Sequence, residues 1–172
     1  MSTDAPLSDP APLQKADDRT AFDCGVPSLT TYLQKYAWQN QQNRSSRTYV
    51  VCRGSRVVGY YTLAAGAVRK AEAPVPVARG LGNYPVPIIL IARLAVDHQE
   101  RGKGLGARLL KDALLRCLHA SNLIGARAVL VHAKDAQAAS FYQHFGFEPS
   151  PIDALHLFLA IQDIQASIDA AP

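Results

Sequence analysis

The sequence lacks any apolar run long enough to cross a membrane. The longest candidate, residues 88–96, is interrupted by Arg93, whereas a membrane-spanning helix needs about 20 consecutive apolar residues. The first 12 residues are polar and proline-rich, with no basic segment ahead of an apolar one, so they do not resemble a secretory signal peptide. We therefore expect no membrane association and a cytoplasmic location.

Cysteine is scarce, and Cys24, Cys52 and Cys117 stand singly along the chain. An odd, scattered set suits a reducing compartment and excludes a disulfide framework or a zinc site. No two of the 5 histidines have metal-ligand spacing, so no metal is expected. The P-loop pattern G-x-x-x-x-G-K-[ST] is missing, as is the G-x-S-x-G turn that carries a hydrolase nucleophile.

The chain nevertheless has enough apolar residues for a core. Its 172 residues are 48% hydrophobic and 19% charged, which is typical of one globular domain. The formal net charge of +4 permits, without requiring, a polyanionic partner such as nucleic acid or a phosphorylated cofactor. Residues 1–20, in which aspartates and prolines are interleaved, are expected to form a flexible arm, and residues 21–172 a single domain.

Hydrophobic periodicity predicts alternating helices and strands after this arm. A helix is expected from Pro27, and then a hairpin of residues 48–53 and 56–65 around a Gly-Ser turn. Residues 66–87 hold four prolines (Pro74, Pro76, Pro85 and Pro87) and are expected to form a long functional loop. The remaining expected elements are strands at 88–96, 128–133 and 155–161 and helices that begin near residues 105, 135 and 162. This order predicts one mixed α/β domain.

The most informative segment is a glycine-spaced loop between a buried strand and an amphipathic helix. Residues 96–106 read VDHQERGKGLG. Glycines let the backbone turn tightly and approach a ligand, and the free N–H groups at a helix start attract anions. The loop is therefore interpreted as a phosphate or pyrophosphate site, to which Arg101 and Lys103 add positive charge. An isolated motif of this kind is more simply an ordinary strand-to-helix turn.

A second segment favours the functional interpretation. Residues 135–147 read DAQAASFYQHFGF, about forty residues after the loop. The pair R-x-x-G-x-G (101–106) and A-x-x-F-Y-x-x-F-G-F (138–147) resembles the GCN5-related N-acetyltransferases (GNAT), over roughly residues 48–161. The resemblance implies a central, mostly antiparallel sheet with a splayed strand, flanked by helices. It also implies acetyl-CoA as the cofactor.

The same resemblance assigns site residues. Tyr142 is implied as the general acid beside the thioester sulfur, and the Val96 N–H group would hold the oxyanion. Asp135 stands where the family often has Asn, and it keeps the helix-capping role. The residues implied to bind acetyl-CoA are Leu94, Ala95, Val96, Arg101, Gly102, Lys103, Gly104, Leu105, Gly106, Asp135 and Phe141. Spacing alone favours a core aromatic whose hydroxyl bonds to a backbone carbonyl, and the flanking motif favours the catalytic role of Tyr142.

A narrower resemblance covers nearly the whole chain. FDCG at 22–25, IARLAVD at 91–97 and HLFL at 156–159 are similar to the acetyltransferase toxins of bacterial toxin–antitoxin pairs. Such toxins acetylate the α-amino group of aminoacyl-tRNA and so stop translation. The resemblance therefore implies an aminoacyl-tRNA substrate and a neutralising ribbon-helix-helix antitoxin, with operator DNA bound only together with the antitoxin. A homodimer is expected, because relatives of this kind commonly dimerise.

Basic residues are candidates for contacts to the RNA phosphates. Arg93 is the most specific of them, because a charge inside an apolar strand must be paired or line a cleft. The substrate-binding candidates are Arg44, Arg47, Arg69, Lys70, Arg79 and Arg93. A solvated surface explains most charge clusters equally well.

Two other functions remain open at the level of sequence. The protein could acetylate a small amine or a protein, although the basic long loop favours an anionic substrate. It could also be a non-catalytic acetyl-CoA-binding corepressor, although such a module has no need of an acid at Tyr142. His98 and His132 are interpreted as a solvated turn residue and a structural residue.

Overall fold

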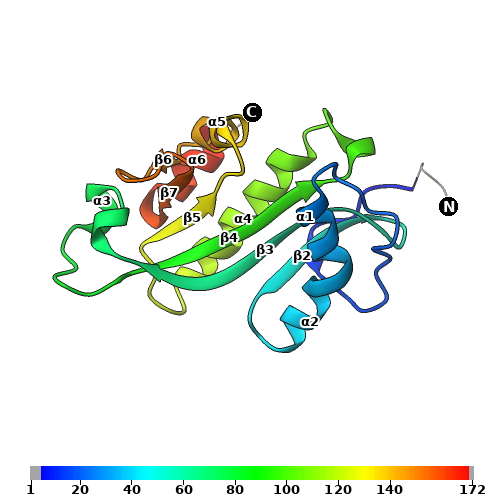
Figure 1. The fold of residues 1–172 in the computed structure, drawn as a ribbon, viewed down its shortest axis with the longest axis horizontal. Coiled ribbons are helices and arrows are strands. Elements are labelled where there is room, and N and C mark those ends of the chain that lie inside the picture. Colours follow the sequence, from blue (N-terminus) through cyan, green and yellow to red (C-terminus); the bar gives the residue numbers. More distant parts are fainter. Residues whose placement is uncertain (1–4, 171–172) are drawn as a thin grey trace. The chain divides into compact units, whose positions relative to one another are not determined.

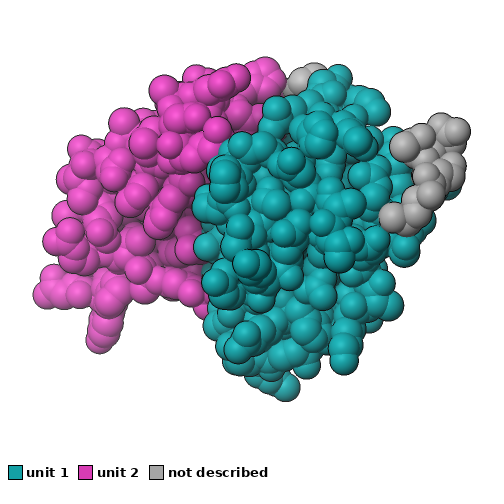
Figure 2. Space-filling model, turned by 45° about the vertical axis from the view of Figure 1, so that its right-hand side comes forward, with its two compact units in different colours: residues 1–64, 92–112 teal, residues 65–91, 113–172 magenta. Residues whose placement is uncertain are grey.

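The computed structural model describes residues 5–170 (Figure 1). The chain divides into two compact units, coloured separately in Figure 2. Among the described residues, unit 1 comprises 5–64 and 92–112, and unit 2 comprises 65–91 and 113–170. No helix within residues 5–170 is long and apolar enough to span a bilayer.

Within residues 5–170, one mixed sheet contains seven strands in the order β1-β2-β3-β4-β5-β7-β6. The pairs β1/β2, β2/β3, β5/β7 and β6/β7 are antiparallel, and β4/β5 is parallel. The strands are β1 (Ala11–Pro12), β2 (Arg47–Arg53), β3 (Arg56–Val68), β4 (Val86–Val96), β5 (Ala128–His132), β6 (Glu148–Pro149) and β7 (His156–Ala160). This arrangement confirms the predicted α/β class with a mostly antiparallel sheet.

Unit 1 is built on the predicted hairpin of β2 and β3. Val50 pairs with Tyr60, and a bulge lies between Val51 and Cys52. The helical segment beside this hairpin (Figure 1) consists of α1 (Pro27–Thr31), the π-helical turn η1 (Tyr32–Tyr36) and α2 (Ala37–Gln42). Pro27 begins α1, since proline fits the first helical position, where no N–H group is needed. Phe22, Leu33 and Tyr60 are buried in the core of this unit.

Residues 5–20 do not form the predicted flexible arm. β1 pairs with β2, and the Leu13 N–H group donates to the Thr48 carbonyl at 2.9 Å. The Leu13 side chain is only 1% exposed and belongs to the core of unit 1. The sequence suggested an arm because its aspartates are polar and its prolines interrupt regular structure, whereas the buried Leu13 side chain and the pairing of β1 with β2 attach the segment. Residues 1–4 lie outside the described residues.

Unit 2 contains the parallel pair and the C-terminal strands. β4 pairs with β5 over Ile88–Ile91 and continues to Val96. The other helices within residues 5–170 are η2 (Lys70–Glu72), α3 (Val75–Ala78), η3 (His98–Glu100), α4 (Leu105–Ser121), α5 (Ala136–His144), η4 (Ile161–Asp163) and α6 (Ile164–Ala170). Of these, η3 lies in unit 1 and α4 begins there. The predicted helices near 105, 135 and 162 are thereby confirmed.

The segment 66–87 is less of a loop than the sequence predicts. β3 continues to Val68, and two short helices, η2 and α3, follow. Ala73, Val77 and Ala78 are buried in the core of unit 2 with Ile88 and Phe158. Prolines at the start of α3 are compatible with helix, so proline content alone was misleading here.

Candidate active site

The glycine-spaced loop lies in unit 1, between β4 and α4. Gly102 and Gly104 have φ values of +76° and +81°, which only glycine adopts at low cost. Among the described residues, none accepts a hydrogen bond from the backbone N–H groups of residues 102–106. These N–H groups precede or begin a 17-residue helix, α4, whose dipole favours an anion at its start. The loop therefore has the groups that a pyrophosphate site requires.

A buried ion pair lies beside this loop. The Glu100 side chain is 4% exposed and accepts hydrogen bonds from Arg53 Nη2 at 2.7 Å and Arg53 Nε at 3.0 Å. Lys103 Nζ lies 3.4 Å from the same carboxylate. The hydrogen bond from Arg53 is the main reason that the pKa of Glu100 lies below its ordinary value. Lys103 is therefore partly neutralised from within the protein.

Arg101 is also engaged by the protein. Its guanidinium donates to the Cys24 carbonyl oxygen. Of the other predicted cofactor residues in unit 1, Ala95 and Leu105 have buried side chains, and Leu94, Val96 and Gly106 are partly buried. Both cationic side chains of this loop thus have protein partners, whereas the backbone N–H groups of residues 102–106 have none among the described residues.

Helix α5 of unit 2 carries the candidate acid. The Asp135 carboxylate accepts a hydrogen bond from the Ala138 N–H at 2.8 Å, which confirms the predicted N-cap. The helix ends before Gly146, whose φ of +93° allows the chain to turn. Phe141, partly buried, contacts Tyr142 edge-on with ring centroids 5.1 Å apart. Together these features hold Tyr142 on a short, well-defined helix.

Tyr142 differs from the other buried tyrosines. Tyr60 donates to the Leu29 carbonyl, Tyr61 to Asp112, and Tyr32 bonds to Ser46. Tyr142 is 9% exposed, and within residues 5–170 no hydrogen bond to its hydroxyl offsets this burial. Tyr142 thus differs from the alternative of a structural tyrosine whose hydroxyl bonds to a backbone carbonyl. Burial raises the pKa of Tyr142 to about 12, so the phenol stays protonated at neutral pH.

The predicted substrate-binding residues form separate groups. In unit 1, the Arg93 guanidinium lies 3.7 Å from the centre of the Tyr32 ring, a cation–π contact that the sequence did not predict. The Tyr32 hydroxyl bonds to Ser46, which lies in the connection between the exposed residues Arg44 and Arg47. In unit 2, Lys70 and Arg79 line one shallow cavity of about 370 Å³, while Arg69 pairs with Glu72 at 3.5 Å.

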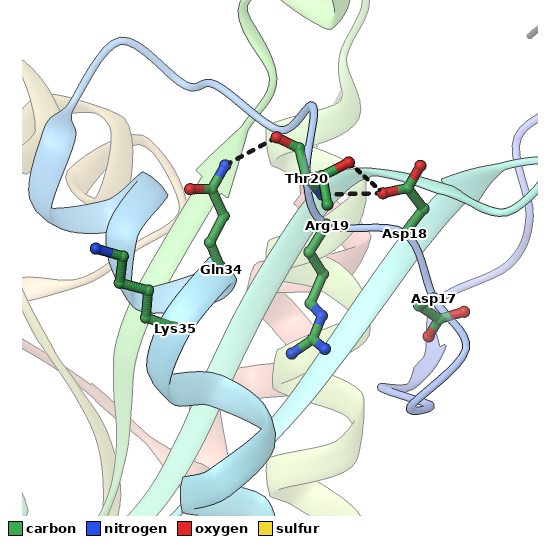
Figure 3. A pocket seen from close by; sticks show the side chains of 6 residues that line it. All are labelled: Asp17, Asp18, Arg19, Thr20, Gln34 and Lys35. Carbon is green, nitrogen blue, oxygen red and sulfur yellow. Dashed lines mark hydrogen bonds between the residues drawn. The ribbon is translucent and has the colours of Figure 1, made fainter.

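A second cavity, of about 400 Å³, lies in unit 1 (Figure 3) and contains no predicted site residue. Gln34 donates to the Thr20 and Phe22 carbonyls, and Thr20 bonds to Asp18. Its charged lining residues have both signs: Asp17, Asp18, Arg19 and Lys35. In the described part of the chain, no three His, Cys, Asp or Glu side chains cluster as a metal site.

Comparison with known proteins identifies the family. A sequence model described as the acetyltransferase (GNAT) domain matches residues 44–149. The chain belongs to the GNAT acetyltransferases. A tRNA-acetylating toxin of Mycobacterium tuberculosis is 51% identical over 161 residues, which cover 94% of this chain and 96% of that protein.

Two solved GNAT structures share the fold over nearly their whole length. The toxin AtaT complexed with acetyl-methionyl-tRNAfMet has a TM-score of 0.86 and 27% identity, covering 94% of this chain and 98% of that one. A mutant AtaT bound to the C-terminus of the antitoxin AtaR and to acetyl-CoA has a TM-score of 0.79 and 29% identity, covering 94% and 97%. The predicted GNAT fold and the predicted resemblance to the toxins are confirmed.

The sequence motifs identified only those parts of the candidate site whose residues are neighbours in the chain. The glycine loop and the Phe-Tyr helix are contiguous in sequence, so their residues could be named in advance. The Tyr32–Arg93 contact, the Arg53–Glu100 pair and the bond from Arg101 to Cys24 join residues distant in the chain. The only sequence signals for these contacts were charged residues beside apolar runs.

Proposed function

We propose that this protein is an acetyl-CoA-dependent N-acetyltransferase toxin that acetylates the α-amino group of aminoacyl-tRNA and so blocks translation. The observation that carries the proposal is the 51% identity, over 94% of the chain, to a tRNA-acetylating toxin. The relative AtaT, solved with an acetylated aminoacyl-tRNA, supports the same substrate. The phenol of Tyr142, which has no hydrogen-bond partner within residues 5–170, favours an enzyme over a corepressor that only binds acetyl-CoA.

The glycine loop is suited to acetyl-CoA, which supplies an activated acetyl thioester when it is bound. The free N–H groups of Gly102, Lys103, Gly104, Leu105 and Gly106 would donate to the pyrophosphate oxygens. Leu94, Ala95 and Val96 would align the acetyl-bearing arm along β4, and the Val96 N–H would stabilise negative charge on the acetyl oxygen. Asp135 would support the cofactor site by capping the start of α5, and Phe141 by packing against Tyr142 on the same helix.

Tyr142 would hold a proton at its hydroxyl oxygen for the departing sulfur. The amine nitrogen would form a bond to the acetyl carbon as the carbon–sulfur bond breaks. Because a pKa of about 12 lies above the ordinary thiol value of about 8.5, Tyr142 would stabilise the departing thiolate by donating a hydrogen bond, and the proton lost by the amine would balance the charge of the thiolate. The substrate amine needs little help from a base. Free α-amino groups have pKa values near 7.7–8.0, and the ester of an aminoacyl-tRNA lowers that value further by withdrawing electrons.

The RNA would be held by the basic residues. Guanidinium and ammonium groups neutralise phosphates and release counterions. The proposed contact residues are Arg44, Arg47, Arg69, Lys70, Arg79 and Arg93. Lys70 and Arg79 share one cavity, and Arg93 lies over Tyr32 in the other unit. Beyond the substrate, we propose a homodimer in the cytoplasm, neutralised by a ribbon-helix-helix antitoxin, with operator DNA bound only by the toxin–antitoxin complex.

The proposal is tested by replacing the Tyr142 hydroxyl. Tyr142→Phe should slow acetylation of charged tRNA by roughly 100-fold or more, the usual contribution of a general acid, while acetyl-CoA binding stays within a few-fold. Tyr84→Phe is the matched control, because Tyr84 is 77% exposed. The assay measures transfer from labelled acetyl-CoA.

Several acceptors are compared in the same assay. Charged tRNA should be acetylated, and uncharged tRNA, a polyamine and a bulk protein should not. Preferred acetylation of the polyamine or the protein would favour the small-amine or protein acetyltransferase instead. If Tyr142→Phe retains activity within a few-fold of the unaltered protein, the acid role of Tyr142 is wrong.

A further inference from the structure

Residues 23–25, far from the cofactor loop in sequence, are bonded directly to the segment that leads into it. The Asp23 N–H donates to Asp97 Oδ2 at 3.1 Å, and the Asp23 carbonyl accepts from the His98 N–H at 2.9 Å. The Arg101 guanidinium donates to the Cys24 carbonyl. We call these contacts between residues 23–25 and residues 97–101 the N-terminal anchor. All of them lie within unit 1.

Asp97 is the buried centre of the N-terminal anchor. Its side chain is 1% exposed, and Oδ1 accepts from the Gln99 N–H at 3.0 Å while Oδ2 accepts from Asp23. The carboxylate therefore satisfies one donor on each of two segments that are 74 residues apart. A buried carboxylate with donors on both oxygens is held in one position.

Arg101, an exposed residue, places its guanidinium close to Gly25 at the other end of the N-terminal anchor. A Cβ atom added at Gly25 would lie 2.7 Å from Arg101 Nη2, and Gly25 has a φ of +81°. Glycine at position 25 thus leaves the space that the guanidinium occupies. Gly25 is itself fixed, since its N–H donates to Asp23 Oδ1 at 2.8 Å.

The N-terminal anchor continues into α1. The Cys24 N–H donates to Thr30 Oγ1 at 3.2 Å, and Cys24 Sγ lies 3.4 Å from the same oxygen. Thr30 lies in α1, which leads into η1, where Tyr32 contacts Arg93. One connected set of hydrogen bonds therefore joins the start of the cofactor loop to the helix that carries Tyr32.

We propose that the Arg101 side chain is a positioning residue, which fixes the cofactor loop by bonding to Cys24 rather than by contacting the pyrophosphate. This inference rests on the proposed function and deepens its account of acetyl-CoA binding. A guanidinium that turned toward a phosphate would leave the Cys24 carbonyl without the donor it has, at the cost of a charged hydrogen bond. The conformation of the loop backbone then contributes more to acetyl-CoA binding than the positive charge of the Arg101 side chain does.

The test compares Arg101→Ala with Asp23→Ala, which loosens residues 23–25 without touching the loop. Arg101→Ala should weaken acetyl-CoA binding on the order of tenfold, as the loss of one charged hydrogen bond does. Asp23→Ala should weaken it several-fold. The double variant should bind no more weakly than Arg101→Ala alone, because both changes disrupt one set of contacts. Calorimetry measures the dissociation constant of acetyl-CoA.

Kinetics separate positioning from a general loss of structure. The KM for acetyl-CoA should rise in both variants, while kcat at saturating acetyl-CoA stays within about twofold, since Tyr142 is unaffected. Gly25→Ala, which crowds the guanidinium, should raise the same KM. Lys111→Ala, which removes an exposed charge from α4, is the control and should bind acetyl-CoA normally. Thermal unfolding verifies that each variant is folded.

The outcomes distinguish this inference from the proposed function. If Asp23→Ala binds acetyl-CoA normally while Arg101→Ala binds weakly, or if the losses multiply in the double variant, Arg101 contacts the cofactor and the positioning role is wrong. If the unaltered protein binds no acetyl-CoA at millimolar concentration, the proposed function itself fails.

Discussion

Glu100 shows how much a single side chain contributes beside the cofactor loop. Its carboxylate is buried and bonded to Arg53 through two donors, with Lys103 nearby. Removing one partner of a buried ion pair leaves the other uncompensated, which is costly. Arg53 also donates to the Ala5 carbonyl, so the pair secures the N-terminal segment as well as the loop.

This pair predicts a dependence of stability on pH. Because the pKa of Glu100 is lower in the folded than in the unfolded protein, the unfolded state binds more protons between the two values. The ionised Glu100 carboxylate therefore stabilises the fold fully above about pH 5. This stabilisation is lost as the pH falls through the pKa that Glu100 has in the folded protein. Glu100→Gln should cost roughly 1.5–3 kcal/mol at pH 7 and should flatten the decline in the free energy of unfolding below pH 5.

Urea denaturation of both proteins at several pH values between 3 and 7 measures this difference. Asp169→Asn, on the C-terminal helix α6, controls for the loss of a carboxylate elsewhere. Parallel pH profiles for Glu100→Gln and the unaltered protein would contradict the role given to Glu100.

Among the secondary-structure elements, those with a strong local pattern follow the sequence closely. The hairpin of β2 and β3, the long helix α4 and the capped helix α5 were predicted from alternation, periodicity and Asp135. The strands β1 and β6 were not predicted, because each has two residues and exists only through its partner strand. The helical spacing after Pro27 also gave no sign of the π-helical turn η1, in which Tyr32 and Leu33 are buried.

The attachment of β1 predicts a large effect from a residue near the N-terminus. Leu13→Ala should lower the free energy of unfolding by about 2–5 kcal/mol, the range for truncating a buried leucine. Leu123→Ala is the matched control, since Leu123 is 72% exposed, and it should change stability by less than about 0.5 kcal/mol. Denaturant titration measures both. Equal, small effects would mean that residues 5–20 form a mobile arm after all.

For the whole molecule, the positions of the basic residues matter more for RNA binding than the modest net charge of +4. Arg44, Arg47 and Arg79 are exposed, and Lys70 shares a cavity with Arg79. The charges proposed to meet the RNA are thus spread over both compact units, whereas the loop proposed for acetyl-CoA presents backbone N–H groups. The two substrates should therefore respond differently to salt.

Raising the salt concentration should increase the KM for aminoacyl-tRNA steeply and the KM for acetyl-CoA weakly, because RNA binding releases many counterions. Lys70→Ala and Arg79→Ala should each reduce the slope of log KM against log salt by about one. Lys111→Ala should leave that slope unchanged. Steady-state acetylation between 50 and 300 mM salt measures the slopes, and identical salt responses for the two substrates would exclude phosphate contacts as the main source of RNA affinity.

Contiguous patterns were sufficient to reveal the α/β class, the glycine loop and the N-cap at Asp135, because each depends on neighbours a few residues away. Tyr142 was singled out as a candidate acid by the resemblance to the GNAT family. The partners of charged groups depended on packing across the chain. Arg101 meets Cys24, Asp97 meets Asp23, and Arg93 meets Tyr32 only because strands and loops distant in sequence fold together. No local periodicity encodes such pairings, since many donors and acceptors are equally compatible until the core brings two of them within hydrogen-bond distance.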